Sequence, residues 1–207
     1  MIRGAIFDVD GTLLDSMPIW KDAGEKYLLA EGLAPEKGLG DILFPLSLSE
    51  GAAYLKKRFL PEKPAEEIRE GVLDIIGHFY REEAQLKPGM AERLEEYRRR
   101  GIRMAVATTG NRELVTAAFS RLGIDGYFSA VFSAEGLRTS KREPGIFFTA
   151  ARALGTEPGE TLVLEDALYA LQTAKSAGFL TAAVEDDSNL PWREEMIRVA
   201  DYYIPCR

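Results

Sequence analysis

Two carboxylates stand one residue apart at the end of a short apolar run near the start of the chain. Residues 2–7 form the run, Asp8 and Asp10 close it, and Gly11 follows at once. Charge at the end of a buried strand is costly unless it is paired, bound to a cation or used in a reaction. The pair therefore predicts a cation site or a catalytic site at this strand end.

Two other apolar runs also end in polar side chains. Thr108 and Thr109 follow one of them, and Glu165 and Asp166 follow another. Because ligands of an open parallel sheet bind beyond the carboxyl ends of its strands, we expect these side chains to meet the first pair at one rim. Four carboxylates repel one another, so the rim suits Mg²⁺, which takes carboxylate, water and phosphate oxygens.

A phosphate group would find donors at the same rim. The hydroxyls of Thr108 and Thr109 can donate to it, and the backbone N–H groups around Gly11 can form an anion-binding nest. Lys141 is the candidate cation for the phosphate charge. Each feature alone has an ordinary explanation, such as a turn, a helix cap, the acidic start of a helix or a solvated lysine. Their joint placement at strand ends favours the functional interpretation.

The elements that must position these residues alternate along the chain. Near-continuous apolar runs typical of strands buried on both faces occupy residues 2–7, 102–107, 128–132 (a weaker run), 161–164 and 180–184. Helical patterns that end in glycine lie between the later runs, at residues 111–122, 144–154 and 167–177. The alternation predicts an α/β fold with a doubly wound, mostly parallel, Rossmann-like sheet.

A long insertion interrupts this alternation after the first run. A parallel crossover needs only a dozen or so residues, yet the second run begins at residue 102. The intervening chain has helical patterns at residues 16–31, 49–59, 64–84 and 90–100, and Ser47 with Glu50 matches a capping box. We therefore predict an α-helical cap at residues 16–86, inserted into a catalytic core of residues 1–15 and 87–207.

Bulk properties exclude several classes of partner. The 207 residues carry a net charge of −7, which argues against a basic surface for nucleic acid or an anionic membrane. The single cysteine, Cys206, and the lack of a secretory or membrane-spanning apolar stretch favour a cytoplasmic protein. We expect a small-molecule partner, a monomer or weak homo-oligomer, and a packed or surface role for His78, the only histidine.

Four segments together resemble the motifs of the haloacid dehalogenase superfamily, in particular β-phosphoglucomutase-like phosphatases with a helical cap. They read Ile-Phe-Asp-Val-Asp-Gly-Thr-Leu-Leu-Asp-Ser, Val-Ala-Thr-Thr-Gly-Asn, Lys-Arg-Glu-Pro-Gly-Ile-Phe and Leu-Glu-Asp-Ala-Leu-Tyr-Ala. The resemblance covers essentially the whole chain, and the predicted insertion falls where the family has its cap.

The resemblance implies a phosphoric monoester hydrolase that acts on a small phosphorylated metabolite with Mg²⁺. Asp8 would be the nucleophile that forms an aspartyl-phosphate, and Asp10 the general acid and base, with its carbonyl on the metal. Thr108 and Lys141 would hold the phosphoryl oxygens. The metal would be held by Asp8 and by Asp166 together with Glu165, directly or through water.

Departures from the family bear on the alternatives. Trp20 stands where phosphomutases carry a histidine, and residues 43–49 lack the arginine that grips a second phosphate, so a β-phosphoglucomutase-like mutase is disfavoured. Asp10 argues against a dehalogenase, and the surroundings of Lys21 against an imine-forming phosphonate hydrolase. A non-enzymatic phosphate- and Mg²⁺-binding switch, as in receiver domains, is a further alternative.

Substrate specificity is expected from residues outside the four-part rim. The candidates are Ser16, Trp20, Lys21 and Phe44 in the cap, with Asn111 and Arg112 after the second motif. For the last two, a helix-capping or surface role is an equally good interpretation.

Overall fold

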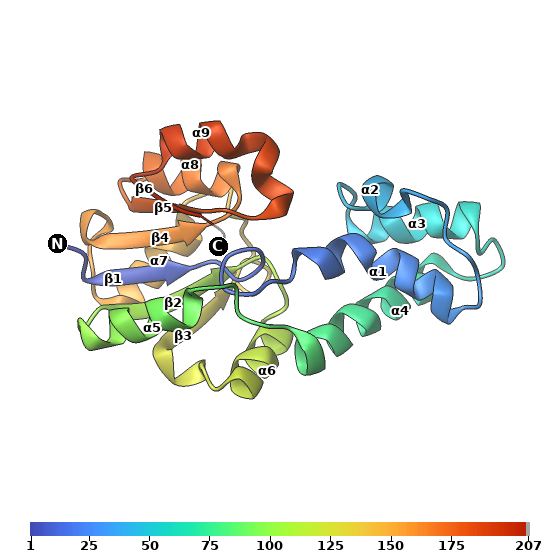
Figure 1. The fold of residues 1–207 in the computed structure, drawn as a ribbon, viewed down its shortest axis with the longest axis horizontal. Coiled ribbons are helices and arrows are strands. Elements are labelled where there is room, and N and C mark those ends of the chain that lie inside the picture. Colours follow the sequence, from blue (N-terminus) through green and yellow to red (C-terminus); the bar gives the residue numbers. More distant parts are fainter. Residues whose placement is uncertain (206–207) are drawn as a thin grey trace. The chain divides into compact units, whose positions relative to one another are not determined.

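A computed structural model describes residues 1–205 of the chain, and Cys206 lies outside the described part. Its sheet has six strands that all run parallel, in the order β3-β2-β1-β4-β5-β6. The strands are β1 (Gly4–Phe7), β2 (Arg103–Thr108), β3 (Phe128–Ser133), β4 (Thr161–Glu165), β5 (Leu180–Val184) and β6 (Tyr202–Ile204). Figure 1 shows them with helices on both sides, so the predicted doubly wound α/β fold is confirmed.

Helices cover the two faces of this sheet. They are α5 (Met90–Arg99), α6 (Arg112–Leu122), α7 (Gly145–Leu154), α8 (Leu168–Ser176) and α9 (Arg193–Val199). Strand side chains alternate, so Ile6 packs with α7 and α8 on one face while Phe7 contacts Tyr97 of α5 on the other. The four predicted helices among these agree with the observed bounds to within one residue, and glycines at 123 and 155 close α6 and α7 in the left-handed conformation.

The sheet order places β1 at the point where the winding reverses. The chain moves outward through β2 and β3, then returns to build β4, β5 and β6 on the other side of β1. Phe7 lies opposite Val106 of β2 and Leu164 of β4, so these three strands end almost level. Residues that follow them therefore meet at the switch point, where ligands of such sheets bind.

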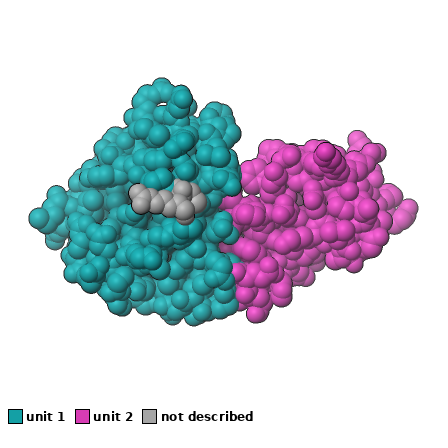
Figure 2. Space-filling model, viewed as in Figure 1, with its two compact units in different colours: residues 1–15, 84–207 teal, residues 16–83 magenta. Residues whose placement is uncertain are grey.

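The chain divides into two compact units, coloured separately in Figure 2. One holds the sheet and comprises residues 1–15 and the chain from residue 84 onward; the other comprises Ser16–Glu83. Residues 84–86, which we grouped with the insertion, cluster with the sheet-bearing unit, and the Asp15 N–H donates to the Gln85 carbonyl at 3.0 Å.

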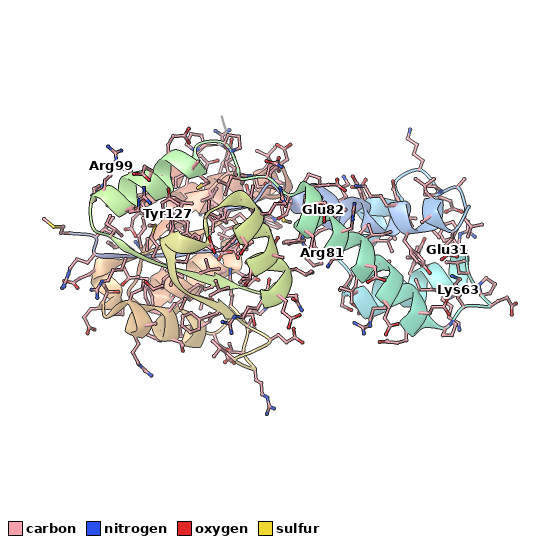
Figure 3. The ribbon with its side chains drawn as sticks, turned by 90° about the horizontal axis from the view of Figure 1, so that it is seen from below. Glu31, Lys63, Arg81, Glu82, Arg99 and Tyr127 are labelled. Atoms are coloured by element: carbon pink, nitrogen blue, oxygen red, sulfur yellow. The ribbon has the colours of Figure 1, made fainter. Side chains whose placement is uncertain are left out.

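The regular elements of the unit Ser16–Glu83 are all helices. It contains α1 (Met17–Ala30), α2 (Leu39–Leu43), α3 (Leu48–Arg58), α4 (Ala65–His78) and a π-helical turn η1 (Phe79–Glu83). The capping box predicted at Ser47 and Glu50 is present at the start of α3. Lys63 approaches Glu31 to 2.7 Å, and Figure 3 shows the two at one end of this unit.

His78, for which we expected a packed or surface role, is exposed. One strand and two α-helices, all short, were not predicted. β6 has three residues, α2 has five and α9 has seven, so each is shorter than the pattern needed to reveal it. Among the residues that the structure describes, no helix is both long and apolar enough to cross a bilayer.

Candidate active site

Asp8 is the centre of the site because β1 ends in the middle of the sheet. Its backbone N–H donates to the Leu164 carbonyl of β4 at 3.0 Å, which continues the parallel pairing by one residue beyond the strand. Its side chain is buried and accepts a hydrogen bond from Lys141 Nζ. A carboxylate held in this way is fixed in direction and points from the strand end into the rim.

Lys141 enters the site from the segment between β3 and α7. Only 2% of its surface is exposed, and its Nζ donates to Glu165 Oε2 at 2.7 Å as well as to Asp8. Burial alone would lower the pKa of this ammonium, but the two carboxylates outweigh burial and raise the pKa above its ordinary value. Lys141 is therefore charged, and it joins the ends of β1 and β4.

The acids of β1 and β4 form a cluster of oxygen ligands. Carboxylate oxygens of Asp8, Glu165 and Asp166 lie within 4.8 Å of one another, and all three side chains are buried. Burial and the charge of Asp8 raise the pKa of Glu165 to about 8 and that of Asp166 well above its usual range. Ionising all three acids beside a single ammonium is therefore costly unless a cation is bound, and this set of carboxylate oxygens fits a hard divalent cation.

Thr12 adds a hydroxyl to this cluster that the sequence analysis did not single out. Its Oγ1 lies 3.4 Å from Asp166 Oδ1 and is fully buried. The first motif thus touches the fourth directly. The position of Thr12 directly after Asp10 and Gly11, in the turn at the end of the first strand, could have identified it.

Asp10 and Thr108 lie together on the β2 side of Asp8. A Cβ atom built on Gly110 would be 3.2 Å from Asp10 Oδ2 and 3.2 Å from Thr108 Oγ1, so both side chains converge on this glycine. The Gly110 N–H donates to Thr108 Oγ1 at 2.8 Å, which leaves the hydroxyl proton of Thr108 for another acceptor. Thr108 is fully buried, whereas Thr109 is exposed.

Gly11 shapes the turn that follows Asp10. Its φ of 77° lies in the left-handed region, which explains a glycine after Asp10. Its N–H donates to the Leu14 carbonyl at 3.0 Å, so this group is used within the turn. That N–H groups around Gly11 bind phosphate stays a prediction.

The two residues after the second motif serve the start of α6. Asn111 is its N-cap, and Asn111 Oδ1 accepts the N–H groups of Glu113 at 2.9 Å and Leu114 at 3.1 Å. Arg112 is the first helical residue and is exposed. The capping interpretation accounts for Asn111.

The candidates in Ser16–Glu83 are spread over that unit. Ser16 is buried at the start of α1, and the Lys21 ammonium pairs with Asp41 at 2.7 Å. Trp20 and Phe44 line an apolar cavity of about 250 Å³ between α1, α2, α3 and α4, and Trp20 Nε1 donates to the Tyr80 hydroxyl at 3.2 Å. Lys21 is thus held by an acid, while Trp20 and Phe44 share one apolar space.

Comparison with known proteins agrees with this chemistry. Residues 2–178 match the model of the haloacid dehalogenase-like hydrolases. Hexitol phosphatase A of Escherichia coli K12 is 29% identical over 195 residues, which cover 94% of this chain and 88% of that protein. Phosphoglycolate phosphatase of Rhodobacter capsulatus is 29% identical over 184 residues, which cover 86% and 82%.

Solved structures with the same fold include two informative neighbours. A putative β-phosphoglucomutase from Thermotoga maritima has a TM-score of 0.85 at 22% identity, with 99% of this chain and 94% of that one covered. CbbY from Rhodobacter sphaeroides, in complex with phosphate, has a TM-score of 0.77 at 27% identity and the same coverage. The predicted family and enzyme class are confirmed, and the chain belongs to the haloacid dehalogenase-like hydrolases.

Proposed function

We propose that the protein is a Mg²⁺-dependent phosphatase that hydrolyses a small phosphorylated metabolite through an aspartyl-phosphate. The observation that carries the proposal is the buried cluster at the switch point. There Asp8 is fixed by Lys141 and shares an oxygen-ligand set with Glu165 and Asp166. A nucleophile, a cation site and a fixed positive charge at one strand end are the parts that phosphoryl transfer requires.

In the first step Asp8 attacks the phosphorus atom. A bond forms between a carboxylate oxygen of Asp8 and phosphorus, and the bond to the leaving oxygen breaks. Asp10 gives its proton to that oxygen, so the product leaves as an alcohol. Asp10 is suited to this role because its carboxylate converges on Gly110 and Thr108, on the β2 side of the cluster.

In the second step Asp10 takes a proton from water, and the oxygen of that water attacks phosphorus. The bond to Asp8 breaks, and inorganic phosphate and the free carboxylate result. Lys141 and the Thr108 hydroxyl hold the phosphoryl oxygens in both steps. Bound Mg²⁺, held by Asp8, Asp166 and the Asp10 carbonyl with support from Glu165, would neutralise charge on the nucleophile and the phosphoryl group.

The relatives support a small substrate. Their names state hexitol phosphatase, phosphoglycolate phosphatase and fructose-1-phosphate phosphatase activities, all on small phosphorylated metabolites. For this chain we propose the same substrate class.

A phosphate-release screen over phosphorylated metabolites, with and without Mg²⁺, tests this function. We expect Mg²⁺-dependent release from at least one monophosphate and from a generic aryl phosphate, and its loss in Asp8→Asn. Release that is unchanged in Asp8→Asn would contradict the proposal. Isomerisation of a sugar phosphate primed by a bisphosphate would show a mutase instead.

A further inference from the structure

Lys87, Asp186 and Asn189 form a buried polar chain that the proposed mechanism does not use. The Lys87 ammonium donates to the Asp186 carboxylate, and both side chains are about 95% buried, with 4% and 5% exposed. An ion pair buried to this degree carries a large desolvation cost, so its stabilising value alone does not explain it. The question is what this pair holds in place.

Asp186 organises the loop that follows β5. Its Oδ1 accepts the Ser188 N–H at 2.9 Å, and its own N–H donates to Asn189 Oδ1 at 3.1 Å. These reciprocal contacts fix the Asn189 amide, which is itself buried. The loop after β5 therefore holds the Asn189 side-chain amide in one orientation.

The Asn189 amide is directed at the metal-binding loop. Its Nδ2 donates to the Asp166 carbonyl at 3.0 Å and to the Val184 carbonyl at 2.9 Å. One NH₂ group thus joins the end of β5 to the residue that we propose as a metal ligand. Groups that hydrogen-bond to a metal ligand orient that ligand. Their loss typically lowers metal affinity or activity 10–100-fold.

Lys87 anchors the other end of this chain to the first motif. Its N–H donates to the Leu13 carbonyl at 2.9 Å, and Leu14 pairs with Leu86 in an antiparallel bridge. The segment that re-enters the sheet-bearing unit from residues 16–83 is thereby tied to the turn after Asp8 and Asp10. Lys87 spans from that segment to the loop after β5.

We infer that Lys87, Asp186 and Asn189 act as a brace that positions Asp166 for metal binding. The three are positioning residues, since none is among the residues assigned above to nucleophile, acid–base or phosphate contacts. The inference rests on the proposed function in one respect only, the assignment of Asp166 as a metal ligand. It predicts that the brace sets metal affinity separately from substrate affinity.

The test is a titration of the full-length protein with Mn²⁺. Binding is measured from the electron paramagnetic resonance signal of the Mn²⁺ that stays free. In Asn189→Leu we expect roughly 10-fold weaker Mn²⁺ binding. The Mg²⁺ concentration for half-maximal phosphate release should rise by a similar factor, while KM for an aryl phosphate at saturating Mg²⁺ stays within about twofold. A purely structural role would not separate these two constants.

Thr161→Val is the matched control. Thr161 begins β4, at the opposite end of the strand from Asp166, and its buried hydroxyl lies 2.7 Å from that of Thr156. The variant also loses a buried polar contact and should lower the midpoint of thermal unfolding without changing Mn²⁺ affinity. Weakening in Asn189→Leu no greater than in Thr161→Val would overturn the inference.

A second variant keeps the test decisive if Asn189→Leu does not fold. Lys87→Met combined with Asp186→Asn removes both charges together, so no unpaired charge stays buried. Weaker Mn²⁺ binding in this variant supports the brace, and wild-type affinity overturns it. Wild-type protein that binds Mn²⁺ but hydrolyses no phosphate ester would contradict the proposed function while leaving the brace intact.

Discussion

At the scale of single residues, the proposed mechanism gives different tasks to two acids of the same type. Asp8 is fixed by Lys141 and lies within the oxygen cluster, which suits a nucleophile beside a cation site. The carboxylate of Asp10 instead converges on Gly110 and Thr108. In the proposed mechanism, this separation would let one acid attack while the other carries a proton.

Asp10→Asn tests that separation. The amide keeps the shape of the side chain and the backbone carbonyl but cannot transfer the proton, so kcat should fall about 10²–10⁴-fold. Steady-state phosphate release measures the loss. Asp15→Asn, an exposed acid of the same motif, is the control and should retain wild-type turnover; a normal kcat in Asp10→Asn would remove Asp10 from the mechanism.

Lys141→Met tests the charge balance of the cluster. The substitution leaves the buried acids without their ammonium, so the metal-free protein should lose about 3–5 kcal/mol of unfolding free energy. Saturating Mg²⁺ should restore part of this loss, because it binds the folded state. Denaturant unfolding with a chelator and with Mg²⁺ measures both effects, and the exposed neighbour variant Arg142→Met should change neither.

At the scale of elements, strand ends and helix starts position the chemistry. The level ends of β1, β2 and β4 bring Asp8, Thr108 and Glu165 to one rim. Helix α6 starts just after this rim, and its cap is Asn111. The same short segment therefore closes the site and begins a helix.

Asn111→Ala separates capping from substrate contact. Loss of the two N–H contacts should cost about 1 kcal/mol of unfolding free energy, and Asn111→Ser, which keeps a capping oxygen, should recover most of it. Denaturant unfolding gives the stability, and KM for the best substrate gives the contact. A large rise in KM shared by both variants would show that the Asn111 amide binds substrate.

The sequence alone predicted the polar residues at the strand ends but not the buried residues that hold them in place. Acids and threonines that follow apolar runs identified the rim, because ligands of an open parallel sheet bind beyond the carboxyl ends of its strands. Lys87 was part of an apparent chain break, Lys87-Pro-Gly, and nothing local marks a lysine whose partner lies 99 residues away. Asp186 comes soon after the end of β5, so the same reasoning about strand ends could have identified it.

The short strand β6 was missed because its own residues carry too little pattern. β6 is a three-residue strand at the sheet edge, so its pairing with β5 rather than its own pattern defines it. Which strand it pairs with depends on how distant segments fold back, which periodicity does not encode.

At the scale of the whole molecule, the buried pair Lys87–Asp186 links stability to pH. Burial raises the pKa of Asp186, but the hydrogen bonds from Lys87 and Ser188 outweigh it, and the net pKa is lowered. A lowered carboxyl pKa contributes stability above the unfolded value near 3.9 that is lost as pH falls through the folded value.

The corresponding prediction compares wild type with the charge-free double variant Lys87→Met and Asp186→Asn. The unfolding free energy of wild type, relative to the variant, should fall as pH decreases from about 5 to below the folded pKa. Denaturant unfolding across this range, in the presence of a chelator, measures the difference. A difference that is constant with pH, or that grows on acidification, would contradict the assigned direction.

The central claim is that the phosphoryl group passes through Asp8, and trapping tests it most directly. The enzyme is mixed with Mg²⁺ and a phosphate ester that it hydrolyses, and the reaction is quenched in acid. The protein is then digested, and its peptides are analysed by mass spectrometry. We predict a phosphoryl group on Asp8 in wild type, and neither that group nor phosphate release in Asp8→Asn. Phosphoryl transfer to another residue, or turnover that persists in Asp8→Asn, would contradict the account.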